Sequence, residues 1–116
     1  MTQIKNLTKK TILHNSPTFA ISSFDQAKGF MFSRPKMRAI IFVFNPPRIV
    51  SLHMWFVFGA IDVIGLDSNY VVVAKKENFK PWKFWNSKLE VNYVVELPVG
   101  TINNSKTCIG DVLKLD

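Results

Sequence analysis

His53 and Asp62 are the two side chains of this sequence that could serve together as an acid and a base. His53 lies beside Trp55 on a partly polar strand face, and Asp62 lies among aliphatic residues, where a carboxylate is costly unless it is paired or hydrogen-bonded. Within hydrogen-bonding reach in a cleft, the two could support a hydrolase-like reaction. The structural alternatives are a hydrogen-bonded histidine and a carboxylate that accepts backbone N–H bonds in a turn or pairs with an arginine.

Glu96 is a second carboxylate in an apolar strand, and it precedes the loop sequence Pro98-Val99-Gly100. Its structural interpretation is a glutamate at the end of a strand that caps this loop. Its functional interpretation is membership of a ligand site built from polar residues that recur beside apolar strands. The ligand site that we hypothesise comprises His53, Asp62, Lys80, Trp82 and Glu96.

The segment from Lys80 to Trp85 interleaves lysines with aromatic residues. Aromatic rings beside phosphate-binding lysines are a common means of holding single-stranded nucleic acid. The segment is short, however, and the acids Glu77 and Glu90 flank it. A tryptophan loop packed against the domain is therefore favoured over a nucleic-acid site, and an exposed patch of Trp82 and Trp85 would serve as a protein interface.

The excess of basic charge is confined to the first half of the chain, whose formal net charge as a whole is +7. Residues 1–60 hold eight lysine or arginine side chains and one acid, whereas residues 61–116 hold seven of each sign. A basic face attracts phosphates, nucleic acid or anionic lipid, but it also occurs as plain solvated surface. The anion-binding residues that we expect are Arg34, Lys36, Arg38 and Arg48.

Several classes of site have no signature in the sequence. It contains no phosphate loop, dinucleotide fingerprint, zinc-ligand spacing or nucleophile elbow, so we expect neither a cofactor nor a metal. Cys108 is the only cysteine, which favours a reducing compartment and a small buried side chain. The N-terminus lacks the apolar stretch of a signal peptide, and Pro46-Pro47 interrupts the main apolar region. We therefore expect a cytoplasmic protein without a membrane span.

Short runs rich in Val, Ile and Phe, separated by proline and glycine, are typical of strands and must position these residues. We expect strands at 18–22, 38–44, 48–58, 60–66, 70–76, 91–97 and 112–115, with Asn45-Pro46-Pro47 ending the second. A capping-box pattern predicts one short helix near residues 23–29. The predicted fold is mainly β (β-rich α+β), a compact sandwich or barrel-like domain of about six to eight strands. Residues 1–116 are expected to form a single domain, with 1–15 as a less ordered segment.

A series of short motifs occurs in an order that resembles one protein family. The motifs are Gly29-Phe30-Met31-Phe32 with Arg34, Ile41-Phe42-Val43-Phe44, His53-Met54-Trp55-Phe56, Ile61-Asp62-Val63, Lys80-Pro81-Trp82, Val95-Glu96-Leu97-Pro98-Val99-Gly100 and Gly110-Asp111. From about Ala20 to the C-terminus, the sequence is similar to the domain of unknown function 192 family of bacterial and archaeal proteins. The resemblance implies a compact β-sandwich or barrel-like fold and implies no activity. The sequence departs from the family at Gly59-Ala60-Ile61, where proline usually precedes the Leu-Asp pair, and at Gly65, where a bulky residue is usual.

The leading functional hypothesis is a small non-enzymatic binding or accessory domain with a basic face, whose ligand is an anion. The alternatives are the hydrolase-like enzyme that uses His53 and Asp62 and the protein-interaction domain. The sequence does not identify the partner, and it does not favour nucleic acid.

Overall fold

The structure, a computed structural model, describes residues 3–20, 38–53 and 59–115, and of Ala20 and His53 it describes the backbone alone. Within these residues the chain forms eight strands and one short helix. They are β1 (Ile4–Asn6), β2 (Thr11–His14), β3 (Thr18–Ala20), β4 (Ile40–His53), β5 (Ile61–Leu66), β6 (Val72–Phe79), β7 (Phe84–Pro98), α2 (Thr101–Ser105) and β8 (Leu113–Leu115). The predicted mainly β fold is confirmed. The helix predicted near residues 23–29 lies outside the described residues.

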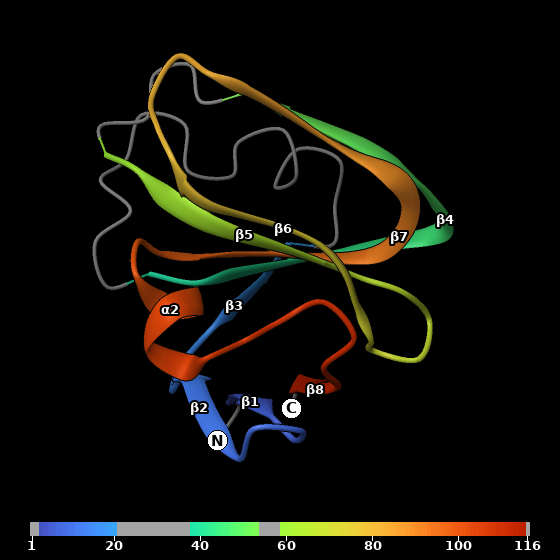
Figure 1. Cartoon of the computed structure of the whole chain (residues 1–116). Helices are drawn as coiled ribbons and strands as arrows, with labels where there is room; N and C mark the ends of the chain where they lie inside the picture. Colours follow the sequence, from blue (N-terminus) through green and yellow to red (C-terminus); the bar gives the residue numbers. More distant parts are fainter. Residues whose placement is uncertain (1–2, 21–37, 54–58, 116) are drawn as a thin grey trace.

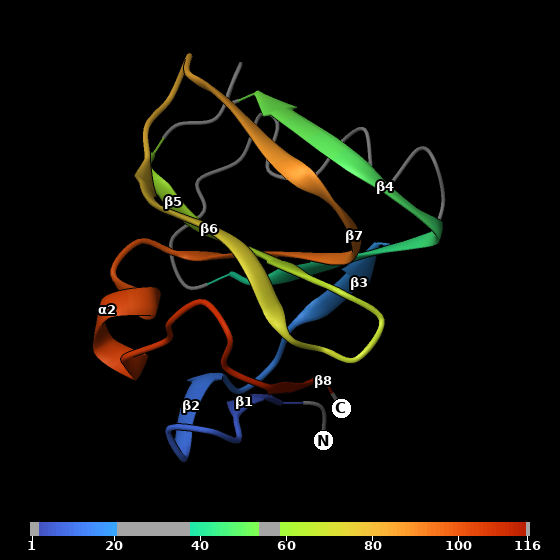
Figure 2. The same cartoon turned by 45° about the vertical axis from the view of Figure 1, so that its right-hand side comes forward.

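Five of the strands form a large, strongly bent sheet in the order β3-β4-β7-β5-β6. Neighbouring strands run antiparallel, except for β3 and β4, which are parallel. The long strands β4 and β7 turn back together, so that their outer halves lie over the rest of the sheet (Figure 1, Figure 2). Because β7 lies between β4 and β5, its C-terminal half is in the interior of the molecule.

The other three strands form a small sheet in the order β2-β1-β8, which lies with α2 below the large sheet in Figure 1. β1 and β2 both lie within residues 1–15, the segment that the sequence predicts to be less ordered. These strands contribute Ile4 and Leu13 to the core. Each strand is so short that alternation buries only one large apolar side chain, and this weak pattern explains why the sequence does not reveal them.

Two apolar clusters cover the opposite faces of the large sheet. The interlayer core, between the large sheet and the layer of the small sheet and α2, comprises Ile4, Leu13, Ala39, Ile41, Ile64, Leu66, Val72, Val95, Leu97, Ile102 and Leu113. The bend core, on the concave face, comprises Ile40, Phe42, Phe44, Val50, Ile61, Val63, Phe79, Val91 and Val94. Alternate residues of β4 and β5 enter the two clusters, which is why these strands are apolar on both faces.

The predicted end of a strand at Asn45-Pro46-Pro47 is wrong, because β4 continues through these residues to His53. The ladder with β7 is irregular there, with a register shift between Val43 and Arg48. Proline lacks a backbone N–H group, and a strand tolerates it at a bulge because the ladder bond is already missing. The strands predicted at 38–44 and 48–58 are therefore two halves of one bent strand as far as His53.

The remaining predicted strands are present with shifted boundaries. β5 and β8 match the predictions within two residues, whereas β7 begins at Phe84, seven residues before the predicted start. The two sheets do not close into a barrel within the described part of the chain. Among the residues that the structure describes, no helix has the length and apolar character needed to cross a membrane.

Candidate functional site

Glu96 is a carboxyl group buried on the concave face of the large sheet. In β7 it lies directly opposite Ile40 of β4 and Val63 of β5. Residues opposite each other in a ladder point to the same face, and both of these neighbours belong to the bend core. Glu96 itself is only 7% exposed. The structure thus places an ionisable group among aliphatic side chains.

The carboxyl group of Glu96 receives no hydrogen bond from the residues that the structure describes. Burial raises its pKa to about 8, against an opposing effect of the positive charge of Arg38, and no hydrogen bond from the described part of the chain contributes. At neutral pH, Glu96 is therefore mostly a neutral carboxylic acid, which donates one hydrogen bond and accepts others. The interpretation of Glu96 as a loop cap is wrong, since Asp62 supplies the cap of that loop.

Arg38 lies at the rim of the same face. It precedes Ile40 by two residues, so alternation along the chain places both on one side of the sheet. The Arg38 side chain is exposed, and its charge acts on the Glu96 carboxyl group. A carboxylic acid and a guanidinium group both present hydrogen-bond donors, which is the arrangement that the oxygen atoms of an anion require.

Asp62 lies on the opposite face of the sheet from Glu96, among the residues of the interlayer core. Its Oδ2 atom accepts the backbone N–H groups of Gly100 and Ile102 at 3.1 and 2.9 Å, and its Oδ1 atom accepts that of Asn78 at 3.0 Å. The prediction that Asp62 accepts backbone N–H bonds in a turn is confirmed. Both oxygen atoms are engaged in fixing the end of β6 and the start of α2.

His53 and Asp62 are paired with opposite ends of β7. The backbone of His53 pairs with Phe84, whereas Asp62 pairs with Leu97. The side chain of His53 lies outside what the structure describes, so an acid–base pair of His53 and Asp62 stays a prediction.

Lys80 and Trp82 lie in the loop between β6 and β7 and face solvent. Trp82 is 60% exposed, and the Lys80 side chain is also exposed. The prediction of a tryptophan loop packed against the domain is therefore wrong for Trp82. Trp85, by contrast, is half-buried and packs against the bend core.

Of the predicted anion-binding residues, the structure describes Arg38 and Arg48, which lie apart along the chain of β4 and its start. The Arg48 guanidinium carbon lies 4.4 Å from the centroid of the Phe44 ring, a cation–π contact beyond the register shift of β4. Arg38 lies before the other end of this strand. Arg34 and Lys36 lie outside the described residues.

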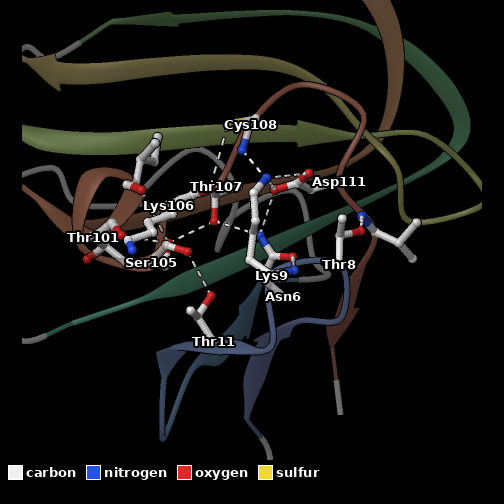
Figure 3. Close-up of polar contacts among 12 residues, drawn as sticks. Asn6, Thr8, Lys9, Thr11, Thr101, Ser105, Lys106, Thr107, Cys108 and Asp111 are labelled. Atoms are coloured by element: carbon white, nitrogen blue, oxygen red, sulfur yellow. Dashed lines mark hydrogen bonds and ion pairs between the residues drawn. The ribbon is translucent and has the colours of Figure 1, made fainter.

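A polar cluster that the sequence does not predict joins the two ends of the chain around the buried carboxylate of Asp111 (Figure 3). The Oδ2 atom of Asp111 accepts hydrogen bonds from Asn6 Nδ2 and from the backbone N–H of Cys108, each at 2.9 Å. Lys9 Nζ donates to both carboxylate oxygens at 2.9 and 2.8 Å. Burial by itself raises the pKa of Asp111, but the hydrogen bonds from Asn6, Lys9 and Cys108 together outweigh it and lower the pKa to about 2.

Hydroxyl groups extend this cluster to α2 and β2 (Figure 3). Asn6 Nδ2 donates to Thr107 Oγ1 at 3.0 Å, and Thr107 Oγ1 shares a hydrogen bond of 2.7 Å with Ser105 Oγ. Thr11 Oγ1 donates to the carbonyl oxygen of Ser105 at 2.8 Å. Because these groups satisfy one another, the cluster serves to hold the small sheet against the C-terminal loop. Cys108 is exposed in this loop, so the prediction that its side chain is buried is wrong.

The acidic, histidine and cysteine side chains within residues 3–20, 38–53 and 59–115 form no group of three or more that could hold a metal ion.

The order of motifs along the chain and the fold agree with a match to known proteins. The model of the domain of unknown function 192 (DUF192) family, described as uncharacterized ACR, matches residues 6–115. This chain belongs to the DUF192 family. The resemblance noted from the sequence is thus confirmed, and the match extends further toward the N-terminus than the motifs do.

Archaeal relatives of this DUF192 chain cover nearly its whole length. A UPF0127 protein of Pyrococcus horikoshii is 33% identical over 112 residues, which are 96% of each chain. A UPF0127 protein of Pyrococcus furiosus is 36% identical over 110 residues, which are 94% of each chain.

Two crystal structures share the fold of the DUF192 chain. A protein of Sinorhizobium meliloti, provisionally assigned as a transcription regulator, superposes with a TM-score of 0.85 at 22% identity and covers 98% of this chain and 91% of its own. A protein of unknown function from Novosphingobium aromaticivorans gives a TM-score of 0.82 at 21% identity, with 97% and 82% covered. These identities support similarity of fold alone.

Proposed function

We propose that this DUF192 protein is a non-enzymatic binding domain that takes a small oxyanion, a carboxylate or a phosphate group, between Glu96 and Arg38. The observation that carries the proposal is the Glu96 carboxyl group, which is 7% exposed and receives no hydrogen bond from the described part of the chain. No fully buried side-chain nitrogen or oxygen atom of the described residues lacks a hydrogen-bond partner, so the Glu96 carboxyl oxygens reach the surface, where they can take a partner from outside the chain. A bound anion would supply it.

The charge state of the two side chains favours an anion over a cation. With a pKa of about 8, the Glu96 carboxyl group is protonated at neutral pH and can donate its O–H to an anionic oxygen. The Arg38 guanidinium group would balance the charge of the ligand. A cation would require the ionised form of Glu96, and Arg38 would repel it.

The position of Glu96 near the end of its strand supports access from solvent. Val99, three residues further along, is 52% exposed, and Arg38 is exposed two residues before the start of the neighbouring strand β4. A small oxyanion could therefore reach Glu96 from the rim of the bend core. It would not displace the apolar side chains at the centre of this core.

Isothermal titration calorimetry with acetate, succinate and inorganic phosphate tests the proposal. We expect the affinity for at least one probe to fall about tenfold per pH unit above the Glu96 pKa of about 8, because binding requires the proton. Glu96→Gln keeps a hydrogen-bond donor that does not titrate, so it should bind the same probe and lose this pH dependence. Failure of all three probes to bind, or the same pH dependence in Glu96→Gln, would contradict the proposal.

Arg48→Gln is the matched control for Arg38→Gln, since both remove one positive charge from β4 or its start. Arg38→Gln should weaken binding by about tenfold or more, the effect of losing a hydrogen bond to a charged group. Arg48→Gln should leave the affinity within about twofold, because its guanidinium group packs on Phe44 instead. Equal effects of the two substitutions would indicate attraction by the overall charge rather than a site at Glu96.

The location that we propose is the cytoplasm, supported by the presence of a single cysteine in 116 residues. Recovery of the protein from a membrane or secreted fraction of the source cells would overturn this part of the proposal.

A further inference from the structure

The connection between β6 and β7 and the first residue of β7 expose two aromatic side chains, Trp82 and Phe84. Trp82 is 60% exposed and Phe84 is 70% exposed, and within the described ranges no other large hydrophobic side chain is as exposed as these two. Single apolar side chains are common on protein surfaces, whereas neighbouring exposed aromatic rings are typical of interaction sites. Their position separates them from the Glu96 carboxyl group, which lies in the interior.

Strand alternation explains why these rings stay in solvent. At the start of β7, Trp85 and Ser87 point inward, and Trp85 packs against the bend core. Phe84, Asn86 and Lys88 alternate with them and are exposed. Asn86 Nδ2 donates to Ser51 Oγ of β4 at 2.8 Å. This hydrogen-bonded pair of exposed polar side chains joins the two strands on the outward surface. We call the exposed residues Ser51, Phe84, Asn86 and Lys88 of the two strands, together with the exposed Trp82 and Lys83 of the preceding loop, the outer-arm face.

The charge around the outer-arm face is positive. Between Asn78 and Leu89 the chain holds three lysines, Lys80, Lys83 and Lys88, and no acid. Of the flanking acids, Glu77 forms an ion pair with Lys75 at 3.5 Å. Glu90 lies past Lys88, opposite Ile49 of β4. Three lysines and the polar pair of Ser51 and Asn86 thus accompany the exposed aromatic side chains of this segment.

We propose that the outer-arm face binds single-stranded nucleic acid, with bases stacked on Trp82 and Phe84 and phosphates paired with the adjacent lysines. Stacking tolerates any base, and lysine neutralises the backbone, so the two features together suit this partner. An anionic membrane surface also attracts tryptophan and lysine. It fits less well, because Ser51 and Asn86 would leave water when Phe84 entered the lipid, whereas a nucleic acid offers them hydrogen-bonding partners.

We test this proposal by fluorescence anisotropy with a labelled oligothymidylate. Its length of about twelve nucleotides lies within the usual site size of domains that bind single strands. Trp82→Ala and Phe84→Ala should each weaken binding by about fivefold or more, the lower limit for losing one stacked base. Trp82→Leu, which keeps apolar bulk and removes the aromatic face, should weaken it similarly. Lys83→Gln should reduce the dependence of log affinity on log salt by about one unit.

Two control substitutions lie on other surfaces. Phe19→Ala removes a ring that is 40% exposed on β3, and Lys5→Gln removes an exposed lysine of β1, so both should leave the affinity for the oligonucleotide unchanged within about twofold. Three outcomes would overturn the proposal. The protein would bind a duplex of the same length with equal affinity, the control substitutions would weaken binding as much as those of Trp82 and Phe84, or the protein would not bind the oligonucleotide at low salt. Binding to phosphatidylglycerol vesicles without binding to the oligonucleotide would assign the face to membranes instead. Glu96→Gln should bind the oligonucleotide as the wild type does, so this outcome and that of the oxyanion test are independent.

Discussion

Glu96 and Asp111 are both buried carboxyl groups, but their surroundings act on them in opposite directions. Asp111 receives hydrogen bonds from Asn6, Lys9 and Cys108, which outweigh the effect of burial and hold its pKa at about 2. Glu96 has no such donors among the described residues, and burial raises its pKa to about 8. The surroundings of Asp111 therefore favour its ionised form at neutral pH, whereas those of Glu96 favour its protonated form.

Replacing Asp111 by Asn should destabilise the protein by about 1–3 kcal/mol, the cost of leaving buried donors without an acceptor. In either orientation the new amide N–H₂ group would face Lys9 Nζ, because Lys9 donates to both oxygen atoms of Asp111. Urea unfolding measures the change in the free energy of unfolding. Lys9→Met is the comparison, and its effect should be smaller because Asp111 keeps the hydrogen bonds from Asn6 Nδ2 and the backbone N–H of Cys108, and the ion pair that is lost is partly exposed to solvent. Wild-type stability of Asp111→Asn would show that the cluster does not hold the two ends together.

Some of these residue roles follow from the sequence, and others depend on contacts that it does not reveal. A carboxylate among aliphatic residues requires hydrogen-bond donors, and this reasoning correctly predicts that Asp62 accepts backbone N–H bonds in a turn. The same reasoning failed for Glu96, because only the register of β7 against β4 and β5 shows that it faces the bend core. The partners of Asp111 could not be predicted, since Asn6 lies 105 positions away in the chain.

At the scale of elements, the bend in β4 and β7 creates the concave face on which Glu96 lies. Apolar residues on both faces of 38–44 correctly predicted a central strand. The sequence predicts that this strand ends at Pro46-Pro47. It does not show that a register shift between Val43 and Arg48 accommodates the two prolines within the strand. The β1 and β2 strands are too short for their own pattern to predict, and they are stabilised by distant partners in the C-terminal segment.

Gly65 of β5 lies close to side chains of the neighbouring strands β6 and β7. A Cβ atom added there would lie 2.9 Å from Val91 Cγ1 and 3.4 Å from Ala74 Cβ. Val91 is fully buried and β-branched, so it cannot rotate away at low cost. We expect Gly65→Ala to lower the free energy of unfolding by about 1–3 kcal/mol through overpacking.

The double variant Gly65→Ala/Val91→Ala provides the control for this clash. Removing the Val91 methyl groups should make the Gly65 substitution less costly, so the two effects should not add. Additive losses in thermal or urea unfolding would show that the clash with Val91 is not the cause.

At the scale of the whole molecule, the two carboxyl groups should give the stability a maximum in mildly acidic solution. The folded protein holds the Glu96 proton up to about pH 8, whereas the unfolded chain releases it near 4.5. Its stabilising contribution is complete below that lower value, and it is lost as the pH rises toward 8, by up to about 1.4 kcal/mol per unit. Asp111 behaves in the reverse manner, since its contribution is present above 3.8 and is lost as the pH falls toward 2.

Thermal unfolding across this pH range checks both contributions in one experiment. Glu96→Gln should flatten the decline between about pH 5 and 8, and Asp111→Asn should flatten the decline on the acid side. A wild-type melting temperature that stays constant from about pH 5 to 8 would contradict the assignment of a retained proton to Glu96.

The pairing of β1 with β8 also has a consequence for the way the protein is made. Ile4 lies opposite Leu115 and Asn6 opposite Leu113, and the backbone N–H of Leu7 donates to the carbonyl oxygen of Val112 at 2.8 Å. Contacts so remote in sequence are slow to form, because the intervening chain has to be ordered before they become favourable. β1 can therefore pair with β2 soon after both are synthesised, whereas its ladder with β8 forms only once residues 113–115 have been made, so the small sheet is completed late in folding.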